Sequence, residues 1–143
     1  MTVRKILNLK GSDVVTIAPE KKLLDAISLL AKHRIGALIV TAGNREVVGV
    51  LSERDIVRLL SNKDANRFEN TVASAMTTAV KTCKPDDTIQ HVMQVMTSGR
   101  FRHMPVVEGG KLAGVISIGD VVKHRLEEME RESKHLKEYI ATA

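Results

Sequence analysis

The seven residues GVLSERD at positions 49–55 return almost unchanged as GVISIGD at positions 114–120. In each copy an apolar segment precedes a serine, and an aspartate follows that serine by three residues. This spacing is typical of a helix N-cap with a capping-box partner, which contributes about 1 kcal/mol. The repeated phrase therefore predicts two helices that begin in the same setting, each at the end of an apolar strand.

The repetition extends over most of the chain. An offset of 66 residues superposes two amphipathic helical faces with apolar side chains at i, i+3, i+4 and i+7. The matched pairs are Leu23 with Ile89, Ala26 with Val92, Ile27 with Met93, and Leu30 with Met96. Upstream, TVRKIL (2–7) matches TVASAM (71–76). The pattern indicates an internal duplication.

Each copy predicts the order strand, helix, strand, strand, helix. In the first copy these segments are 14–19, 20–33, 36–40, 46–52 and 53–60. The glycines of EGG (108–110) predict a tight hairpin turn in the second copy, and AGNRE (42–46) takes that place in the first. A copy of fewer than 60 residues buries only about 60% of its unfolded surface, so we expect the two copies to pack together.

The expected division is repeat 1 over 1–62, a polar linker over 63–70, repeat 2 over 71–126 and a helical tail over 127–143. Leu126, Met129, Leu136 and Ile140 share one side of the tail helix, with Ser133 interrupting the stripe. We expect this helix to pack on its own domain, and pairing with a second copy is the alternative.

Composition narrows the class of protein. A chain of 143 residues with 43% hydrophobic and 27% charged residues predicts one compact soluble domain. No apolar run approaches the roughly 20 residues of a membrane-spanning helix, and no signal peptide is evident, which favours the cytoplasm. The single cysteine, Cys83, excludes an intramolecular disulfide and leaves too few thiolates for zinc. The net charge of +5 indicates an anionic partner.

The serine and aspartate of the phrase also have a functional interpretation. A helix N-terminus and a serine hydroxyl can hold a phosphate group, and a carboxylate can accept hydrogen bonds from two ribose hydroxyls. Phosphate and ribose together indicate a nucleotide. The recurrence of the phrase in both repeats favours this interpretation over a helix cap alone.

The PEKKL segment (19–23), RHMPVV (102–107) and the two GVxSxxD phrases resemble the CBS domain, named after cystathionine β-synthase. The resemblance covers about 3–126, and the tandem order is similar to the paired module of that family. It implies a mixed α/β (α+β) fold: two β-α-β-β-α repeats with pseudo-twofold symmetry, plus the C-terminal helix. It further implies a stand-alone, non-catalytic regulatory protein that forms a homodimer, binds adenosine compounds in two clefts and acts on a separate, unidentified protein.

The resemblance also implies the residues of each cleft. The first would use Thr16, Ile35, Gly36, Ala37, Ser52, Arg54 and Asp55. The second would use Thr82, Cys83, Arg100, Phe101, Arg102, His103, Met104, Ser117 and Asp120. In each cleft the aspartate would bind ribose and the serine phosphate. The expected ligands are AMP, ADP, ATP or NAD(H), with S-adenosylmethionine after them. Gly119 replaces Arg54 in the second copy, whose charge is concentrated at 100–103 instead, so we expect different ligand preferences.

Two other classes of function stay open. An interaction module with unoccupied clefts is the main alternative. Nucleic-acid binding has the basic charge in its favour, but an aromatic content of 2% and the lack of tryptophan argue against base stacking. The five histidines match no zinc-protease spacing, and no serine stands in a nucleophile-elbow motif, so we do not expect an enzyme.

Overall fold

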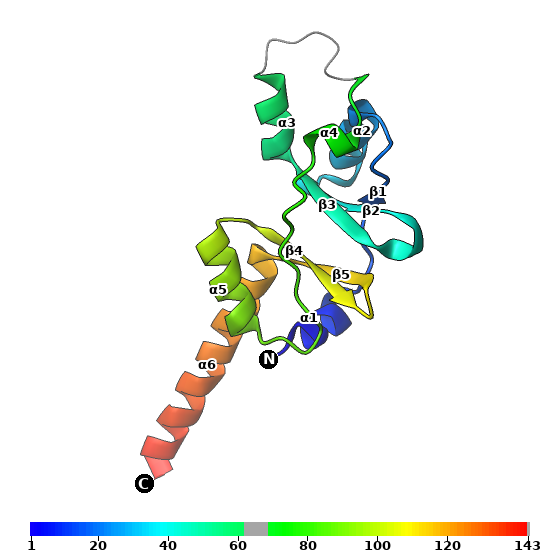
Figure 1. Cartoon of the computed structure of the whole chain (residues 1–143). Coiled ribbons are helices and arrows are strands. Elements are labelled where there is room, and N and C mark those ends of the chain that lie inside the picture. Colours follow the sequence, from blue (N-terminus) through cyan, green and yellow to red (C-terminus); the bar gives the residue numbers. More distant parts are fainter. Residues whose placement is uncertain (62–68, 143) are drawn as a thin grey trace.

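The computed structural model describes residues 1–61 and 69–142, so most of the predicted linker lies outside the described residues. The chain forms two units of alternating helices and strands, one above the other in Figure 1. Repeat 1 contains β1 (Thr16–Ile17), α2 (Leu23–His33), β2 (Ala37–Thr41), the 3-10 turn η1 (Gly43–Arg45), β3 (Val47–Ser52) and α3 (Glu53–Leu60). Repeat 2 contains α5 (Ile89–Gly99), β4 (His103–Glu108), β5 (Lys111–Ser117) and α6 (Ile118–Thr142). A short helix precedes each unit: α1 (Val3–Lys10) and α4 (Val72–Ala75).

Each repeat is built on an antiparallel hairpin. In repeat 1, β2 pairs with β3, and β1 adds a parallel strand on the other side of β2. In repeat 2, β4 pairs with β5, and the first strand is reduced to a single parallel bridge between Cys83 and Val106. Gly109 and Gly110 have φ angles of 60° and 78°, which confirms the turn predicted from EGG.

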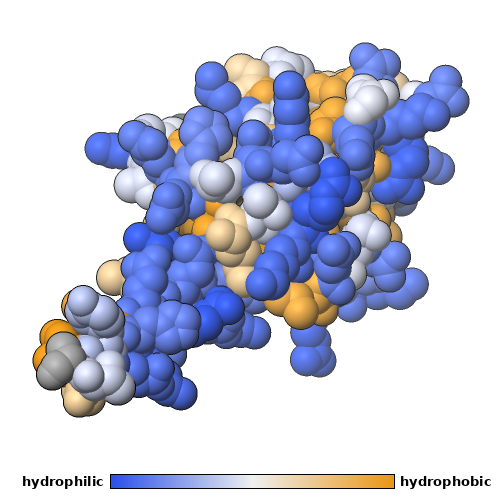
Figure 2. All heavy atoms as spheres, turned by 90° about the horizontal axis from the view of Figure 1, so that it is seen from below, coloured by the Kyte–Doolittle hydropathy of each residue, from blue (hydrophilic) through white to orange (hydrophobic). Residues whose placement is uncertain are grey.

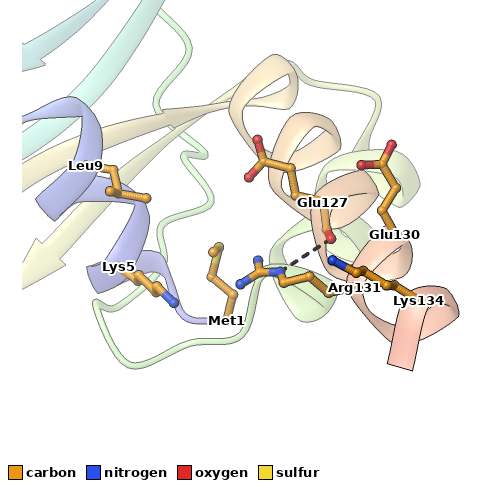
Figure 3. Close-up of a pocket in the computed structure, with 7 residues that line it drawn as sticks. All are labelled: Met1, Lys5, Leu9, Glu127, Glu130, Arg131 and Lys134. Carbon is orange, nitrogen blue, oxygen red and sulfur yellow. Dashed lines mark hydrogen bonds between the residues drawn. The ribbon is translucent and has the colours of Figure 1, made fainter. Parts of the chain in front are cut away.

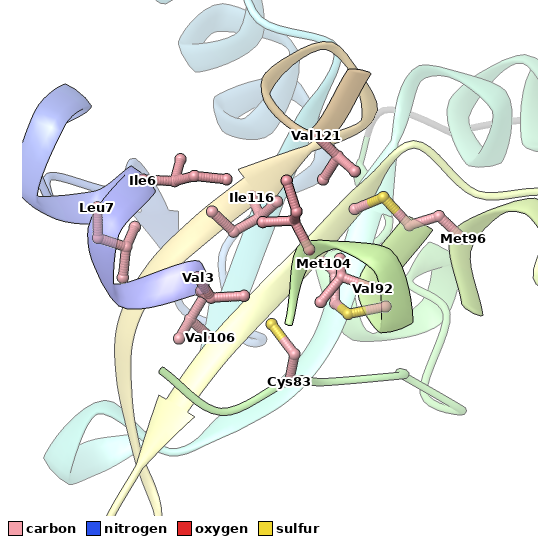
Figure 4. Close-up of a cluster of buried hydrophobic side chains, with 11 residues drawn as sticks. Val3, Ile6, Leu7, Cys83, Val92, Met96, Met104, Val106, Ile116 and Val121 are labelled. Carbon is pink, nitrogen blue, oxygen red and sulfur yellow. The ribbon is translucent and has the colours of Figure 1, made fainter. Parts of the chain in front are cut away.

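The two short helices are exchanged between the repeats. Helix α1 belongs to repeat 1 in sequence, yet it lies beside β5, and Val3, Ile6 and Leu7 join the core of repeat 2 (Figures 1 and 4). Val72 of α4 in turn joins the core of repeat 1. Each repeat therefore completes its core with a helix from the other, and the expected mutual packing is confirmed.

The glycine of the repeated phrase makes room for the exchanged helix. A Cβ on Gly114 would lie 2.7 Å from Cδ2 of Leu7, which follows from the close approach of α1 to β5. A Cβ on Gly49 would lie 2.6 Å from Sδ of Met76, just after α4. The phrase thus begins with glycine because a neighbouring helix covers that position in both repeats.

Helix α6 is one continuous helix of 25 residues, which runs from repeat 2 through the predicted start of the tail at residue 127. Val121 and His124 are its buried residues, and every described residue from Met129 onward is exposed. The distal part projects away from the rest of the chain (Figure 1). The expectation that the tail packs on its own domain is therefore wrong.

Candidate functional site

A cavity of about 650 Å³ lies where four segments from both repeats meet. Residues 36–37 before and at the start of β2 and the β3–α3 junction at 52–55 come from repeat 1. Residues 77–81 after α4 and the α5–β4 junction at 99–103 complete the lining. Segments that connect helices and strands of both repeats therefore surround a space of the size that small-molecule sites usually have.

Basic side chains dominate the lining. Five cationic residues face two carboxylates, which belong to Glu53 and Asp55. The cationic residues are Arg54, Arg58, Lys81, Arg100 and Arg102. All five are exposed, so their charges are available to a ligand. A cavity with this excess of positive charge attracts anions.

The start of α3 holds one of these carboxylates in a defined position. Ser52 is the N-cap, the backbone N–H of Asp55 donates to Ser52 Oγ at 3.3 Å, and the Ser52 backbone N–H donates to Asp55 Oδ2 at 2.9 Å. The predicted capping box is thus confirmed. The other oxygen, Oδ1, accepts a hydrogen bond from Thr77 Oγ1 at 3.1 Å. The exposed Arg58 guanidinium lies 3.8 Å from the same oxygen, so the direct hydrogen bond to Oδ1 comes from a neutral hydroxyl that a ribose hydroxyl could replace.

The corresponding carboxylate of repeat 2 has a charged partner. Asp120 forms the same capping box with Ser117, at 2.9 and 3.1 Å. Lys10, the last residue of α1, donates to Asp120 Oδ2 at 2.7 Å and to the Val115 carbonyl at 3.0 Å. Burial opposes ionisation of Asp120, but the hydrogen bonds from Lys10 and Ser117 outweigh it and lower its pKa. Neither Ser117 nor Asp120 lines the cavity.

His103 closes one side of the cavity near Gly36. A Cβ on Gly36 would lie 3.9 Å from His103 Cε1 and 3.8 Å from Glu53 Cδ, so the three residues are close neighbours. Burial lowers the pKa of His103, and the nearby Lys10 ammonium lowers it further. The imidazole is therefore neutral at pH 7, and the positive charge of 100–103 comes from the arginines alone.

Phe101 contributes the aromatic ring of the described lining. The ring packs against the core of repeat 2 on one side. It also lies directly over Gly99, where a side chain would collide with it. An aromatic ring held in this way offers a face on which a base can stack.

The structure groups the predicted site residues differently from the sequence interpretation. Five residues expected in the first cleft and four expected in the second line the same cavity. They are Gly36, Ala37, Ser52, Arg54 and Asp55 from the first, and Arg100, Phe101, Arg102 and His103 from the second. One cavity thus draws on both repeats, because the start of β2 in one repeat lies near the start of β4 in the other.

The remaining predicted residues lie outside this lining. Thr16 is half-buried in β1, Ile35 packs against the core of repeat 1, and Thr82 is exposed. Cys83 and Met104 are buried in the core of repeat 2 (Figure 4). Burial raises the pKa of the Cys83 thiol to about 12, which keeps it protonated.

Eight lining residues were not among the predicted site residues, including Arg58, Thr77 and Lys81. Arg58 could have been found from its i+3 spacing to Asp55, and the two side chains form an ion pair at 3.8 Å. Thr77 and Lys81 reach the cavity only because α4 is exchanged between the repeats, and no local pattern marks them.

A second hollow of about 440 Å³ lies between α1 and α6 (Figure 3). Charged side chains of both signs surround it, with Lys5, Arg131 and Lys134 facing Glu127 and Glu130. None of the predicted site residues lines it.

Among the described residues no group of His, Cys, Asp and Glu could hold a metal ion, and no helix is long and apolar enough to span a membrane. The cavity between the repeats is therefore the candidate site.

Comparison with known proteins agrees with this architecture. The chain is 44% identical to the CBS-domain containing protein ATU1752 from Agrobacterium tumefaciens, with a TM-score of 0.82 over 87% of this chain and 99% of that one. Two more distant structures share the fold, each with a TM-score of 0.77 over 90% of this chain and 98% of the other. They are CBSX2 in complex with AMP, at 24% identity, and the CBS domain pair of MJ0100 in complex with 5-methylthioadenosine and S-adenosyl-L-methionine, at 23%. The CBS domain family matches residues 3–62 and 72–127, and the chain therefore belongs to this family as a pair of CBS domains.

Proposed function

We propose that this protein is a regulatory module that binds an adenosine nucleotide between its two repeats and passes the occupancy of that site to a separate protein. The observation that carries the proposal is one cavity that combines the Ser52–Asp55 helix start with five basic side chains. The module needs no catalytic group for this role, because binding alone shifts the balance between conformations.

Each part of a nucleotide has a partner in the cavity. Asp55 would accept hydrogen bonds from the ribose hydroxyls in place of the Thr77 hydroxyl that it now holds at 3.1 Å. Phe101 would stack on the base, and the backbone at 36–37 would border it. The arginines at 100 and 102 would pair with phosphate, where guanidinium geometry favours bidentate hydrogen bonds.

Two structural relatives support adenosine as the shared part of the ligand, since one is a complex with AMP and the other with 5-methylthioadenosine and S-adenosyl-L-methionine. The charge of the lining favours phosphorylated ligands for this chain. AMP, ADP, ATP and NAD(H) carry negative charge toward the five basic residues, whereas S-adenosylmethionine carries a sulfonium cation. We therefore rank the nucleotides above S-adenosylmethionine.

We further propose that each chain binds a single nucleotide. Asp120 is the counterpart of Asp55, but its ion pair with Lys10 at 2.7 Å leaves a ribose to compete with an ammonium group. The cavity formed at Asp55 is accordingly the one that we expect to be occupied.

Isothermal titration calorimetry on protein freed of bound ligand tests the proposal. The panel comprises AMP, ADP, ATP, NAD, NADH and S-adenosylmethionine. We expect saturable binding of at least one nucleotide at one site per chain, and a loss of about tenfold in affinity for Arg102→Ala. Lys32→Ala, which removes an exposed charge on α2 away from the cavity, is the matched control. No binding at millimolar concentrations would contradict the proposal and favour an interaction module.

A further inference from the structure

The projecting part of α6 carries large apolar side chains that are exposed to solvent. Leu126, Met129, Leu136 and Ile140 are between 50% and 65% exposed. In Figure 2 the helix stands out as an arm with a mostly hydrophilic visible face and hydrophobic side chains near its tip. Helices in proteins gain most of their stability by packing an apolar face, so an uncovered face of this kind calls for a partner.

The spacing of these side chains is that of a coiled coil. Val122, Leu126, Met129, Ser133, Leu136 and Ile140 follow one another at steps of 4, 3, 4, 3 and 4 residues. We name this stripe the seam. Alternating steps of 4 and 3 average 3.5 residues over each heptad, which keeps one line of side chains facing a partner helix along a left-handed supercoil. Leu126, Ser133 and Ile140 take the a positions, and Val122, Met129 and Leu136 take the d positions.

Ser133 fits this pattern as a polar a-position residue. In the sequence it breaks an apolar stripe, but a single polar residue at an a position is a known way to set the register and the number of strands at some cost in stability. In a parallel pair in register, the two Ser133 side chains would face each other and so avoid an apolar partner.

The charged side chains beside the seam favour a second copy of the same helix as the partner, and they favour the parallel direction. In a parallel pair, each g position lies against the e position five residues further along the other helix. Arg125 would therefore meet Glu130 of the second copy, and Glu132 would meet Lys137 of the second copy. Both pairs have opposite charges. Residues five apart are not neighbours on one helix, so the pairing of Glu132 with Lys137 is available only between chains.

The body of the protein leaves the seam open. Val121 and His124 face the core of the same chain, and the hollow toward α1 involves Glu127, Arg131 and Lys134, none of which belongs to the seam. Arg125 already pairs with Glu128 at 3.3 Å and with Glu132 at 4.0 Å, so its pairing with a second copy would replace contacts within its own helix. The pair between Glu132 and Lys137 would likewise draw Glu132 away from Arg125, which lies 4.0 Å from it in the single chain.

We propose that residues 122–140 of α6 form a parallel two-stranded coiled coil with the same segment of a second copy of this chain. At 1.5 Å per residue the paired segment is about 28 Å long. It is short for a coiled coil, but its start is anchored by the folded repeats, which lowers the entropy cost of forming the helix.

Sedimentation equilibrium on the full chain tests the association. Leu136→Glu places a charge in the seam of both copies, and we expect it to raise the dimer dissociation constant about 100-fold or more. His135→Glu adds the same charge to the neighbouring position outside the seam and should leave the dimer intact. Both positions are exposed in the single chain, so circular dichroism should show unchanged folding. A dimer that is equally stable in Leu136→Glu would overturn the proposal.

Charge exchange and cross-linking test the parallel direction. Glu132→Lys and Lys137→Glu should each weaken the dimer about tenfold, and the double variant should recover the parental affinity. Ser133→Cys should form a disulfide-linked dimer on oxidation, whereas Lys134→Cys, outside the seam, should not. Absence of both the recovery and the Ser133→Cys cross-link would overturn the parallel arrangement.

Discussion

Asp55 and Asp120 hold the same position in the two repeats, but different groups face them. Each carboxylate closes a capping box at the start of a helix. Asp55 then accepts a hydrogen bond from the hydroxyl of Thr77 and has the exposed Arg58 guanidinium 3.8 Å away, whereas Asp120 is hydrogen-bonded to the ammonium group of Lys10 at 2.7 Å. Both partners come from an exchanged segment, since Thr77 follows α4 and Lys10 ends α1. The capping box is thus the same in both repeats. The exchanged segment determines whether the carboxylate is hydrogen-bonded to a neutral hydroxyl that a ligand can replace or to an ammonium group.

The largest expected effect is a difference in nucleotide affinity between variants of the two aspartates. Asp55→Ala should weaken nucleotide binding about 100-fold, because it removes the charged acceptor of the ribose hydroxyls. Asp120→Ala should bind as tightly as the parent. Calorimetry on both variants measures the difference, with circular dichroism as the check on folding, since each change also removes a helix cap. Equal losses in the two variants would show that the carboxylates are equivalent.

The next prediction concerns the glycine that begins the repeated phrase. Gly114→Ala should lower the free energy of unfolding by about 1 kcal/mol, because the new Cβ would lie 2.7 Å from Leu7 Cδ2 and the buried Leu7 side chain would have to shift. In Gly119→Ala the new Cβ would meet the Ser117 hydroxyl at an ordinary 3.6 Å, so this control should be at least as stable as the parent, with a gain of up to about 1 kcal/mol because alanine favours the helix. Urea unfolding compares the two variants. A neutral Gly114→Ala would mean that α1 is not tightly held.

The ion pair at Asp120 should appear in the dependence of stability on pH. Its folded-state pKa is lowered, so the ionised carboxylate stabilises the native state above the unfolded pKa, and this contribution is lost as the pH falls through the folded pKa. Lys10→Ala should therefore be less stable than the parent by about 1 kcal/mol at pH 7, with the difference shrinking below about pH 4. Urea unfolding between pH 3 and pH 7 measures this, and a difference that is constant over that range would contradict it.

The smallest expected effect concerns His103. Its pKa is lowered, so the imidazole is neutral at pH 7 and gains a proton only in more acidic solution. Protonation of His103 adds a cation to the cavity. The affinity for NAD, whose diphosphate stays ionised, should therefore rise about fivefold as the pH falls below the pKa of His103. His103→Gln should bind NAD with an affinity that hardly changes with pH. A rise that persists in this variant would assign the effect to another group.

Features set by neighbouring residues were predictable from the sequence. Helix α3 has the expected bounds, 53–60, because the apolar period and the serine cap are local signals. The paired glycines of the second hairpin were equally clear, since a positive φ angle favours glycine. Helix α6 runs without interruption from repeat 2 into the predicted tail, because no glycine or proline follows Gly119 to end it.

The composition of the candidate site was only partly predictable. The family resemblance predicted nine of the residues that line the cavity, but it assigned them to two different clefts. The partners of the two aspartates, Thr77 and Lys10, lie 22 and 110 residues away along the chain. Such contacts depend on the exchange of α1 and α4, which leaves no periodic signal in either segment. Local patterns therefore located the carboxylates but not the groups that distinguish them.

The exchange of the short helices also has a consequence for the order in which the chain folds during synthesis. Helix α1 is made before the strands and helices of both repeats, yet Leu7 contacts Gly114, and Val3 packs in a core that includes Val121. The apolar face of α1 must therefore stay uncovered until almost the whole second repeat has been made. Contacts between segments so distant in sequence slow folding, and uncovered apolar surface invites aggregation. A nascent chain of this protein is thus expected to need protection at its first helix for longer than at any segment made later.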